Sequence, residues 1–214
     1  MRIIGLLLLS CSLCMSCVQT DKKKALIDDD FLVAEQHLSN QLKAVPEPTV
    51  YPRTIGKDGK LIATPKNDWT EGFYPGCLWY IYEHNREENW KQSAIKWTEA
   101  LEPMKKLTSH HDIGFLIYCS FGNAYRLTGK EEYKDVIIEA ANSLTTRFSE
   151  VTGCIKSWNY RKAWNGRDEW FYPVIIDNMM NLELLYFASK VTGDTRYAKI
   201  ATTHAETTAK NQLR

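Results

Sequence analysis

Apolar positions follow helical spacing along most of the chain after residue 67. Residues 112–127 are apolar around nearly the whole helix, as expected for a helix that is buried on all sides. Thr128-Gly129 ends this stretch, and residues 133–148 then place apolar side chains three and four positions apart, with charges opposite. That spacing predicts an amphipathic surface helix. Together the two stretches predict a hairpin in which the second helix covers the first.

The same pattern occurs twice more. Residues 177–190 are largely apolar, and an apolar stripe from Tyr197 to His204 follows. A less regular copy begins at Phe73, with a second helix striped from Trp90 to Leu101. Repeated units of this kind predict an array of helical hairpins. Because doubly buried and singly buried helices alternate, the pattern favours a double ring, an (α/α) toroid, over a simple solenoid whose helices all keep an exposed face.

The first residues are typical of a signal peptide, with a charged start, an apolar run and small residues after it. Met15-Ser16-Cys17 resembles the processing site of bacterial lipoproteins. We therefore predict a signal peptide over residues 1–16, lipidation of Cys17, and a place in the bacterial cell envelope, periplasmic or membrane-anchored. Any membrane contact would be made through this lipid anchor, and plain secretion is the alternative.

The rest of the chain divides into two predicted regions. Residues 17–67 form a polar lead, a first helix over about 29–42 and an irregular segment over 45–66. Residues 68–214 form the predicted catalytic domain, a partial toroid. The three cysteines beyond the leader, Cys77, Cys119 and Cys154, lack the spacing of a zinc site. We expect them to be buried small hydrophobes, with no metal site and no disulfide framework.

Composition narrows the ligand class. Lys and Arg total 27 against 26 Asp and Glu, a net charge of +1, so the chain offers no basic face of the kind that binds nucleic acid. Aromatic residues are abundant, with 7 Trp, 11 Tyr and 7 Phe. Flat rings stack on the faces of sugars, so a carbohydrate ligand is one interpretation. Aromatic filling of the core is the other.

Candidate chemistry gathers at one rim of the predicted ring. The inner helices of such a ring run parallel, so their first residues lie together. Trp69, His111, Asp112 and Asp177 all stand at or just before the start of an inner helix. Trp158 lies in the loop before the third inner helix, and His204 lies toward the far end of an outer helix, on the same side.

Each of these residues also has a structural explanation. An acidic residue suits the positive end of a helix, so Asp112 or Asp177 could act as a cap. Asp177 follows three apolar residues, which predicts a desolvated carboxylate with a raised pKa. His204 lies on an apolar stripe, where a core histidine is the alternative to a ligand contact.

The loop over residues 154–172 combines Trp, Tyr and Phe with Lys and Arg. Rings that stack and cations that pair with a carboxylate suit an acidic sugar. Single-stranded nucleic acid uses similar groups, but the lipoprotein-type leader argues against it.

Five sequence segments, in this order, resemble the unsaturated glucuronyl hydrolases of glycoside hydrolase family 88. They are DWTEGFYPGCLWYIYE, SHHDIGFLIYCSFGNAYRLTG, IKSWN, IIDNMMNLELLYFASKVTGD and HAETT. The resemblance covers roughly residues 68–214. It implies an all-α fold, an (α/α)6 toroid. It also implies removal of an unsaturated uronate from the non-reducing end of lyase-generated oligosaccharides, by adding water across the C4=C5 double bond.

The resemblance also implies roles for particular residues. Asp177 would be the general acid and base, and Asp112 would hold ring hydroxyls and help to place charge, with His111 beside it. Trp69, Trp158 and His204 match substrate-contact positions. The partner implied is a small acidic oligosaccharide, without a metal or an organic cofactor.

Six hairpins need about 350 residues. This chain holds three, so we expect about the first half of a toroid, with the flanks of its inner helices exposed and self-association as a consequence. Two alternatives stay open. One is an unsaturated rhamnogalacturonyl hydrolase of the same fold, and the other is a non-catalytic, lipid-anchored sugar-binding fragment.

Overall fold

The computed structural model describes residues 3–213, with side chains from residue 22 onward. The chain divides into two units, residues 1–44 and 45–214. The first unit is a single helix, α1 (Ile3–Ala44), and the predicted helix over 29–42 lies within it. The side chain of Cys17 lies outside the described residues. No helix in the described part of the chain is both long and apolar enough to cross a membrane.

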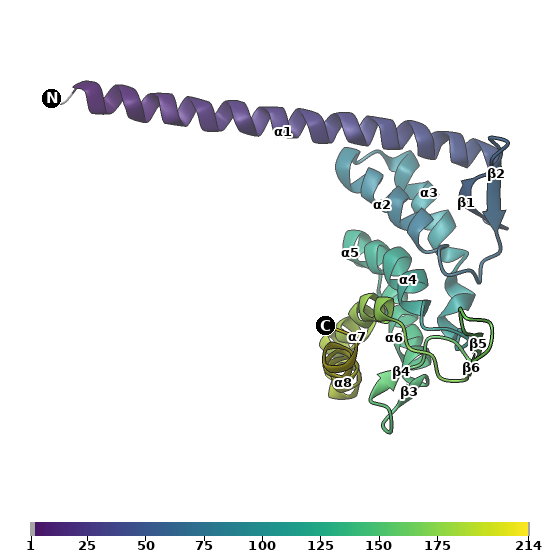
Figure 1. Cartoon of the computed structure of the whole chain (residues 1–214). Helices are drawn as coiled ribbons and strands as arrows, with labels where there is room; N and C mark the ends of the chain where they lie inside the picture. Colours follow the sequence, from purple (N-terminus) through teal and green to yellow (C-terminus); the bar gives the residue numbers. More distant parts are fainter. Residues whose placement is uncertain (1–2, 214) are drawn as a thin grey trace. The chain divides into compact units, whose positions relative to one another are not determined.

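Three helical hairpins make up the second unit (Figure 1). In each of them an inner helix is followed by an outer helix that packs on it. The first hairpin consists of the inner helix α2 (Phe73–Asn85) and the outer helix α3 (Glu88–Glu99). In the second, the inner helix has three parts, α4 (Ile113–Ile117), a π-helical turn η2 (Tyr118–Gly122) and α5 (Asn123–Thr128), and the outer helix is α6 (Glu131–Thr145). In the third, the inner helix begins with a 3₁₀ turn, η3 (Ile176–Asn181), and continues as α7 (Leu182–Thr192), and the outer helix is α8 (Thr195–Gln212). A 3₁₀ helix, η1 (Glu102–Lys106), connects the first hairpin to the second.

Burial confirms the predicted alternation of inner and outer helices in the second hairpin, whereas α2 and α7 each keep exposed residues such as Tyr80 and Tyr186. All five residues of α4 are buried, whereas α6 buries one stripe from Tyr133 to Leu144 and exposes the opposite face. Gly129 and Gly193 end α5 and α7 with positive φ values of 68° and 75°. Glycine adopts this left-handed conformation without strain, which confirms the predicted turns.

The inner helices approach one another closely at glycines. A Cβ added at Gly72 would lie 2.2 Å from the carbonyl oxygen of Phe115, and one at Gly114 would lie 2.4 Å from Oδ1 of Asn181. That amide oxygen accepts a hydrogen bond of 2.9 Å from the backbone N–H of Phe115. Backbone packing, and not side-chain packing alone, therefore sets the spacing between neighbouring inner helices.

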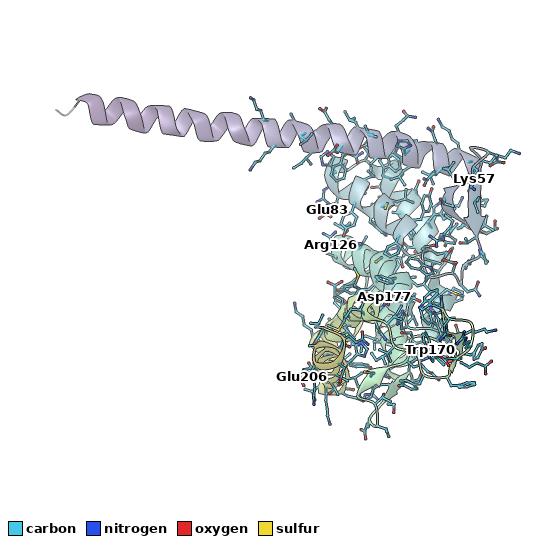
Figure 2. All side chains as sticks on the ribbon, in the orientation of Figure 1. Lys57, Glu83, Arg126, Trp170, Asp177 and Glu206 are labelled. Atoms are coloured by element: carbon cyan, nitrogen blue, oxygen red, sulfur yellow. The ribbon has the colours of Figure 1, made fainter. Side chains whose placement is uncertain are left out.

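Side-chain pairs reinforce this packing near the far ends of the inner helices. The Arg126 guanidinium on α5 donates two hydrogen bonds, of 2.5 and 2.6 Å, to the Glu83 carboxylate on α2. Both residues are labelled in Figure 2.

Part of the segment predicted to be irregular is an antiparallel β-hairpin of β1 (Tyr51–Ile55) and β2 (Leu61–Thr64). It packs on the first helical hairpin because the side chain of Tyr51 is buried. The Tyr51 hydroxyl donates a hydrogen bond of 2.9 Å to the carbonyl oxygen of Trp97. The expectation of an irregular segment is therefore wrong for these residues.

Two smaller differences concern cysteines and loops. Only Cys154 is buried, Cys119 is half-buried and Cys77 is exposed, so the predicted burial holds for one of these three free thiols. The connection between α6 and η3 carries four two-residue strands: β3 (Phe148–Ser149), β4 (Cys154–Ile155), β5 (Arg161–Lys162) and β6 (Glu169–Trp170). They pair as β3 with β4 and β5 with β6.

Candidate active site

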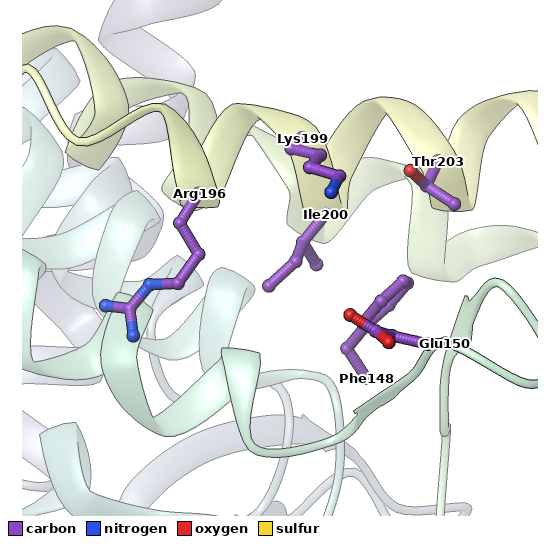
Figure 3. Close-up of a pocket in the computed structure, with 6 residues that line it drawn as sticks. All are labelled: Phe148, Glu150, Arg196, Lys199, Ile200 and Thr203. Carbon is purple, nitrogen blue, oxygen red and sulfur yellow. The ribbon is translucent and has the colours of Figure 1, made fainter.

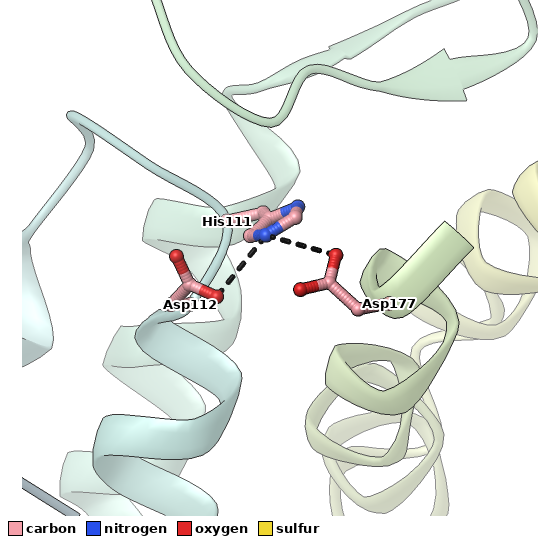
Figure 4. Close-up of side chains that lie close together, drawn as sticks. All are labelled: His111, Asp112 and Asp177. Carbon is pink, nitrogen blue, oxygen red and sulfur yellow. Dashed lines mark ion pairs between the residues drawn. The ribbon is translucent and has the colours of Figure 1, made fainter. Parts of the chain in front are cut away.

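Three polar side chains converge where two inner helices begin. His111 and Asp112 directly precede α4, and Asp177 lies in the first turn of η3. Nε2 of His111 lies 3.1 Å from Oδ1 of Asp112 and 3.5 Å from Oδ1 of Asp177 (Figure 4). The structure thus brings these three residues together, as the parallel directions of the inner helices predict.

Hydrogen bonds of Ser157 connect the segment that carries His111 and Asp112 to the segment that carries Asp177. Its carbonyl oxygen accepts a hydrogen bond of 3.0 Å from the backbone N–H of His111, and its own N–H donates one of 2.8 Å to Pro173. Its hydroxyl accepts a third, of 3.1 Å, from the N–H of Ile175. Since Ser157 is fully buried, these bonds fix the start of α4 against the start of η3.

Asp112 is held as an anion. Its side chain is 6% exposed, with Nδ1 of His110 3.2 Å from one oxygen and Nε2 of His111 3.1 Å from the other. Burial alone would raise the pKa of Asp112, but the hydrogen bonds from the two histidines outweigh it and hold that pKa at about 2. The carboxylate makes no capping hydrogen bond to the start of α4, so helix capping does not explain it.

The pKa of Asp177 is shifted in the opposite direction, upward. Burial raises the pKa of its carboxyl group, the neighbouring negative charge of Asp112 adds to this, and His111 opposes it. Its side chain keeps 42% exposure, so it is less desolvated than the sequence predicts and can be reached from solvent. Two neighbouring carboxyl groups whose pKa values are pushed apart form the pattern of an ionised group beside a proton donor.

The two predicted tryptophans flank the cluster in different ways. The ring centroid of Trp158 lies 5.7 Å from that of His111, and its backbone forms a bridge with His110. Trp69 is 42% exposed and packs against Phe115 in α4, with ring centroids 6.3 Å apart. Trp158 therefore touches the cluster directly, and Trp69 stands one helical turn away from it.

His204 does not line the site. The ring is fully buried in α8, where Nδ1 accepts a hydrogen bond of 2.9 Å from the N–H of Ile155 and Nε2 lies 3.5 Å from the Thr208 hydroxyl. Burial, and then the nearby His111, lower the pKa of His204 to about 4. The ring supports the strand that leads to Trp158, as the core-histidine alternative predicts, and a substrate contact of His204 stays a prediction.

Arg147 is a supporting residue that sequence reasoning missed. It is 4% exposed at the end of α6 and donates to the carbonyl oxygens of Thr108 and Lys156 and, at 3.2 Å, to Oδ1 of Asn159. These acceptors belong to the segment before His110 and to the segment on either side of Trp158. A charged residue between the apolar positions Leu144 and Phe148 was the available signal.

The sequence places His110 at the opening of the second inner helix and Arg161 among the cations of the loop over residues 154–172, but neither was predicted as a site residue. His110 pairs with Asp112, as described above. The Arg161 guanidinium lies 4.7 Å from the ring centroid of Trp158. Both neighbour predicted residues in the sequence, but only the fold shows which way they face.

The same cluster satisfies the distance requirement for one metal ion, because one ligand atom from each of His111, Asp112 and Asp177 lies within 4.8 Å of the other two. Histidine with two carboxylates is a common donor set for divalent metals. Here His110 and His111 already engage both oxygens of Asp112. Nδ1 of His111 and Oδ1 of Asp177 are buried without a hydrogen-bond partner among the described residues. The expectation that no metal is bound stays a prediction.

A separate hollow of about 450 Å³ lies on the outer side, between β3 and α8 (Figure 3). Phe148, Glu150, Arg196 and Lys199 are among its lining residues, and none of the predicted site residues is. The candidate site is therefore the cluster at the inner-helix starts.

Solved structures place this arrangement of covered inner helices among the (α/α)6 toroids. The crystal structure of an unsaturated glucuronyl hydrolase specific for heparin matches with a TM-score of 0.80 and 39% identity, over 87% of this chain and 48% of that chain. An Asp→Asn variant of the Streptococcus agalactiae enzyme, in complex with dGlcA-GalNAc6S, matches with a TM-score of 0.69 and 26% identity, over 87% of this chain and 43% of that one.

Curated relatives agree. An unsaturated glucuronyl hydrolase of Formosa agariphila is 44% identical over 166 residues, which are 77% of this chain and 40% of the relative. An unsaturated chondroitin disaccharide hydrolase of Streptococcus agalactiae is 36% identical over 69% of this chain and 36% of the relative. No protein-family model matches the chain.

The chain is thus a homologue of the unsaturated glucuronyl hydrolases, glycoside hydrolase family 88. It spans less than half the length of the relatives it matches. The predicted fold class, a toroid represented by about its first half, is confirmed.

Proposed function

We propose that this chain supplies the acid/base side of an unsaturated uronyl hydrolase site. Such an enzyme removes the unsaturated uronic acid from the non-reducing end of lyase-generated oligosaccharides. The observation that carries the proposal is the Asp112–His111–Asp177 cluster, whose two carboxyl groups have pKa values shifted in opposite directions. The family relationship supports the substrate class, since a relative binds dGlcA-GalNAc6S.

Asp177 is the proton-transfer group of this proposal. Its raised pKa favours the protonated carboxyl group, which donates its proton to C4 of the double bond. The resulting carboxylate accepts a proton from the water that attacks C5, so Asp177 ends as it began. The sum adds one water across C4=C5, and the hemiketal formed opens and releases the neighbouring sugar.

Asp112 stays ionised through these steps, because its pKa of about 2 lies far below neutral pH. It orients His110 and His111, and its negative charge helps to keep the proton on Asp177. An ionised group that accepts hydrogen bonds in a buried position suits the binding of a sugar hydroxyl.

The test follows the ultraviolet absorbance of the double bond while the protein is incubated with lyase-generated unsaturated disaccharides. We expect Asp177→Asn to slow the loss of this absorbance about a thousandfold. Asp135→Asn, which neutralises an exposed carboxylate of α6, should leave the rate unchanged. Equal rates for Asp177→Asn and the unmodified protein would overturn the assignment. Binding without consumption by the unmodified protein would favour the non-catalytic sugar-binding alternative.

We further propose a cell-envelope location for this activity. The support is the Met15-Ser16-Cys17 sequence at the end of the leader. Metabolic labelling with a radioactive fatty acid should mark the protein, and Cys17→Ser should abolish the label. Retention of label in that variant would contradict lipidation at this position.

A further inference from the structure

The β1–β2 hairpin holds the loop that directly precedes α2, residues 67–72. From β2, the Thr64 hydroxyl donates a hydrogen bond to the carboxyl group of Glu71, which is 1% exposed. From β1, Nε of Arg53 lies 3.8 Å from Oδ1 of Asp68. Both strands of the hairpin therefore contact this loop.

An irregularity in β1 directs Arg53 toward the same loop. Pro52 and Thr54 pair with consecutive residues of β2, which leaves Arg53 between them as the extra residue of a β-bulge. Such a bulge turns a side chain away from the direction that regular alternation would give, and bulges are frequent next to active sites. The guanidinium carbon of Arg53 lies over the indole of Trp69, 5.1 Å from its ring centroid. The bulge thus brings a cation to the face of the loop's tryptophan.

The indole of Trp69 is held by neighbours and still open to solvent. The ring centroids of Phe73 and Phe115 lie 6.1 and 6.3 Å from that of Trp69. Despite these contacts and the cation, Trp69 is 42% exposed. A flat ring that is fixed by its surroundings and reachable from solvent suits stacking on the face of a sugar.

The loop also meets the acid/base cluster. His110 bridges the two, because its Nδ1 lies 3.2 Å from Oδ2 of Asp112 and its Nε2 lies 3.4 Å from the carbonyl oxygen of Asn67. Phe115, on which Trp69 packs, follows Asp112 by three positions, about one helical turn. The orientation of the indole therefore decides how a sugar stacked on it would lie relative to the cluster.

We propose that Arg53 is a positioning residue, which through its contact with Trp69 fixes the orientation in which this indole stacks on the sugar that reacts at Asp177. The stacking on that sugar rests on the proposed function. The orientation of the indole by Arg53 rests on the bulge and the cation–π contact alone, so the two can fail separately.

The first measurement follows the Trp69 indole in the full chain without any ligand. Fluorescence quenching by acrylamide, a neutral quencher, is compared between each protein and its Trp69→Phe counterpart, and the difference gives the contribution of Trp69. Arg53→Gln should raise the quenching constant of this contribution about twofold, because the cation no longer covers the ring. Arg53→Lys, which keeps the charge and loses the planar group, should give an intermediate value. An unchanged constant in Arg53→Gln would overturn the proposal.

The second measurement is a double-mutant cycle on binding. Calorimetry gives the affinity for a saturated disaccharide of glucuronate and N-acetylgalactosamine, which lacks the double bond and cannot be hydrated. Arg53→Gln should weaken binding about fivefold, which corresponds to about 1 kcal/mol. In the Trp69→Ala background the same change should have no further effect, because Arg53 acts through the indole. Absence of binding to the unmodified protein, no loss in Arg53→Gln, or an equal loss in both backgrounds, as for an arginine that contacts the sugar itself, would each contradict the proposal.

Lys60→Gln is the matched control. It removes the same charge from the same hairpin, but Lys60 is exposed and pairs with Asp58. Its quenching constant and its affinity should equal those of the unmodified protein, and effects as large as those of Arg53→Gln would refute a specific role of Arg53. Asp177→Asn should keep both values while losing consumption of unsaturated disaccharides. If Asp177→Asn consumes them at the unmodified rate, the acid/base assignment fails and the role of Arg53 stands.

Discussion

The acid/base cluster and the β5–β6 hairpin are neighbours held in different ways. The cluster stands on inner helices, and His111 and Asp112 are buried. The hairpin has two strands of two residues each, and Trp164 at its side is 82% exposed. Trp158 connects the two, because it contacts His111 on one side and Arg161 on the other.

The difference shows how tightly each region is held. A proton transfer needs its groups held within fractions of an ångström, which packed helices provide. An exposed hairpin is held less tightly, as loops over a rigid scaffold commonly are. If this difference is correct, perturbing the helix contact should affect the chemistry far more than any change in the hairpin.

Among changes outside the cluster itself, the largest effect on the rate is expected for Gly114→Ala. The new Cβ would lie 2.4 Å from Oδ1 and 2.7 Å from Cα of Asn181, so η3 must shift. Overpacking of this kind costs about 1–3 kcal/mol of unfolding free energy. A displacement of about 1 Å between Asp177 and His111 should slow disaccharide consumption about a hundredfold. Initial rates and melting temperatures check both numbers.

Gly129→Asn is its control, because a side chain at Gly129 meets nothing within 4 Å. Asparagine also tolerates the left-handed conformation there. If Gly114→Ala reacts as fast as Gly129→Asn, the glycine contact does not set the spacing of the cluster.

Arg147→Met should have the next largest effect, because it removes a support common to both regions. The buried guanidinium bonds carbonyl groups on the two segments, at Thr108 and Lys156. Loss of the charged hydrogen bonds of this buried side chain should lower the free energy of unfolding by about 2–3 kcal/mol in urea titrations. Arg126→Met, which breaks an exposed pair with Glu83, should cost under about 1 kcal/mol. Similar losses in the two variants would show that Arg147 is not a special support.

The smallest expected effect is acid sensitivity from His204. Its pKa falls from 6.5 to about 4 in the folded protein, so the unfolded state binds more protons between these values. The contribution of the neutral His204 to the free energy of unfolding is therefore fully present above about pH 6.5. It decreases as the pH falls toward 4, by about 2 kcal/mol at pH 5. His204→Gln should flatten this part of the stability profile, whereas the exposed His37→Gln should not. An unchanged profile in His204→Gln would assign the acid sensitivity to other groups.

The sequence was most informative where burial is periodic. The three hairpins and the closeness of Asp112 to Asp177 could be predicted, because parallel inner helices bring their first residues together. The structure adds that Asp112 does not cap its helix but pairs with two histidines.

Features that depend on tertiary contacts were not predictable. The inner helices are interrupted by η2 and begin with η3, which no spacing of apolar residues specifies. The β1–β2 hairpin is stabilised by a tyrosine that packs 46 positions away, on Trp97. The apolar stripe around His204 favoured a core residue and the family resemblance a ligand contact, and the hydrogen bond from the N–H of Ile155 to its ring could not be predicted from either.

The bonds of Ser157 to Pro173 and Ile175 close the base of the hairpin before it leaves the helical body. Residues 159–172 therefore form a cassette whose two ends stay fixed whatever lies between them. Such a cassette can be exchanged between homologues, or diversified in a library, while the helices beneath it keep their register. Fourteen consecutive residues could in this way be replaced without a change in the helices that carry Asp112 and Asp177.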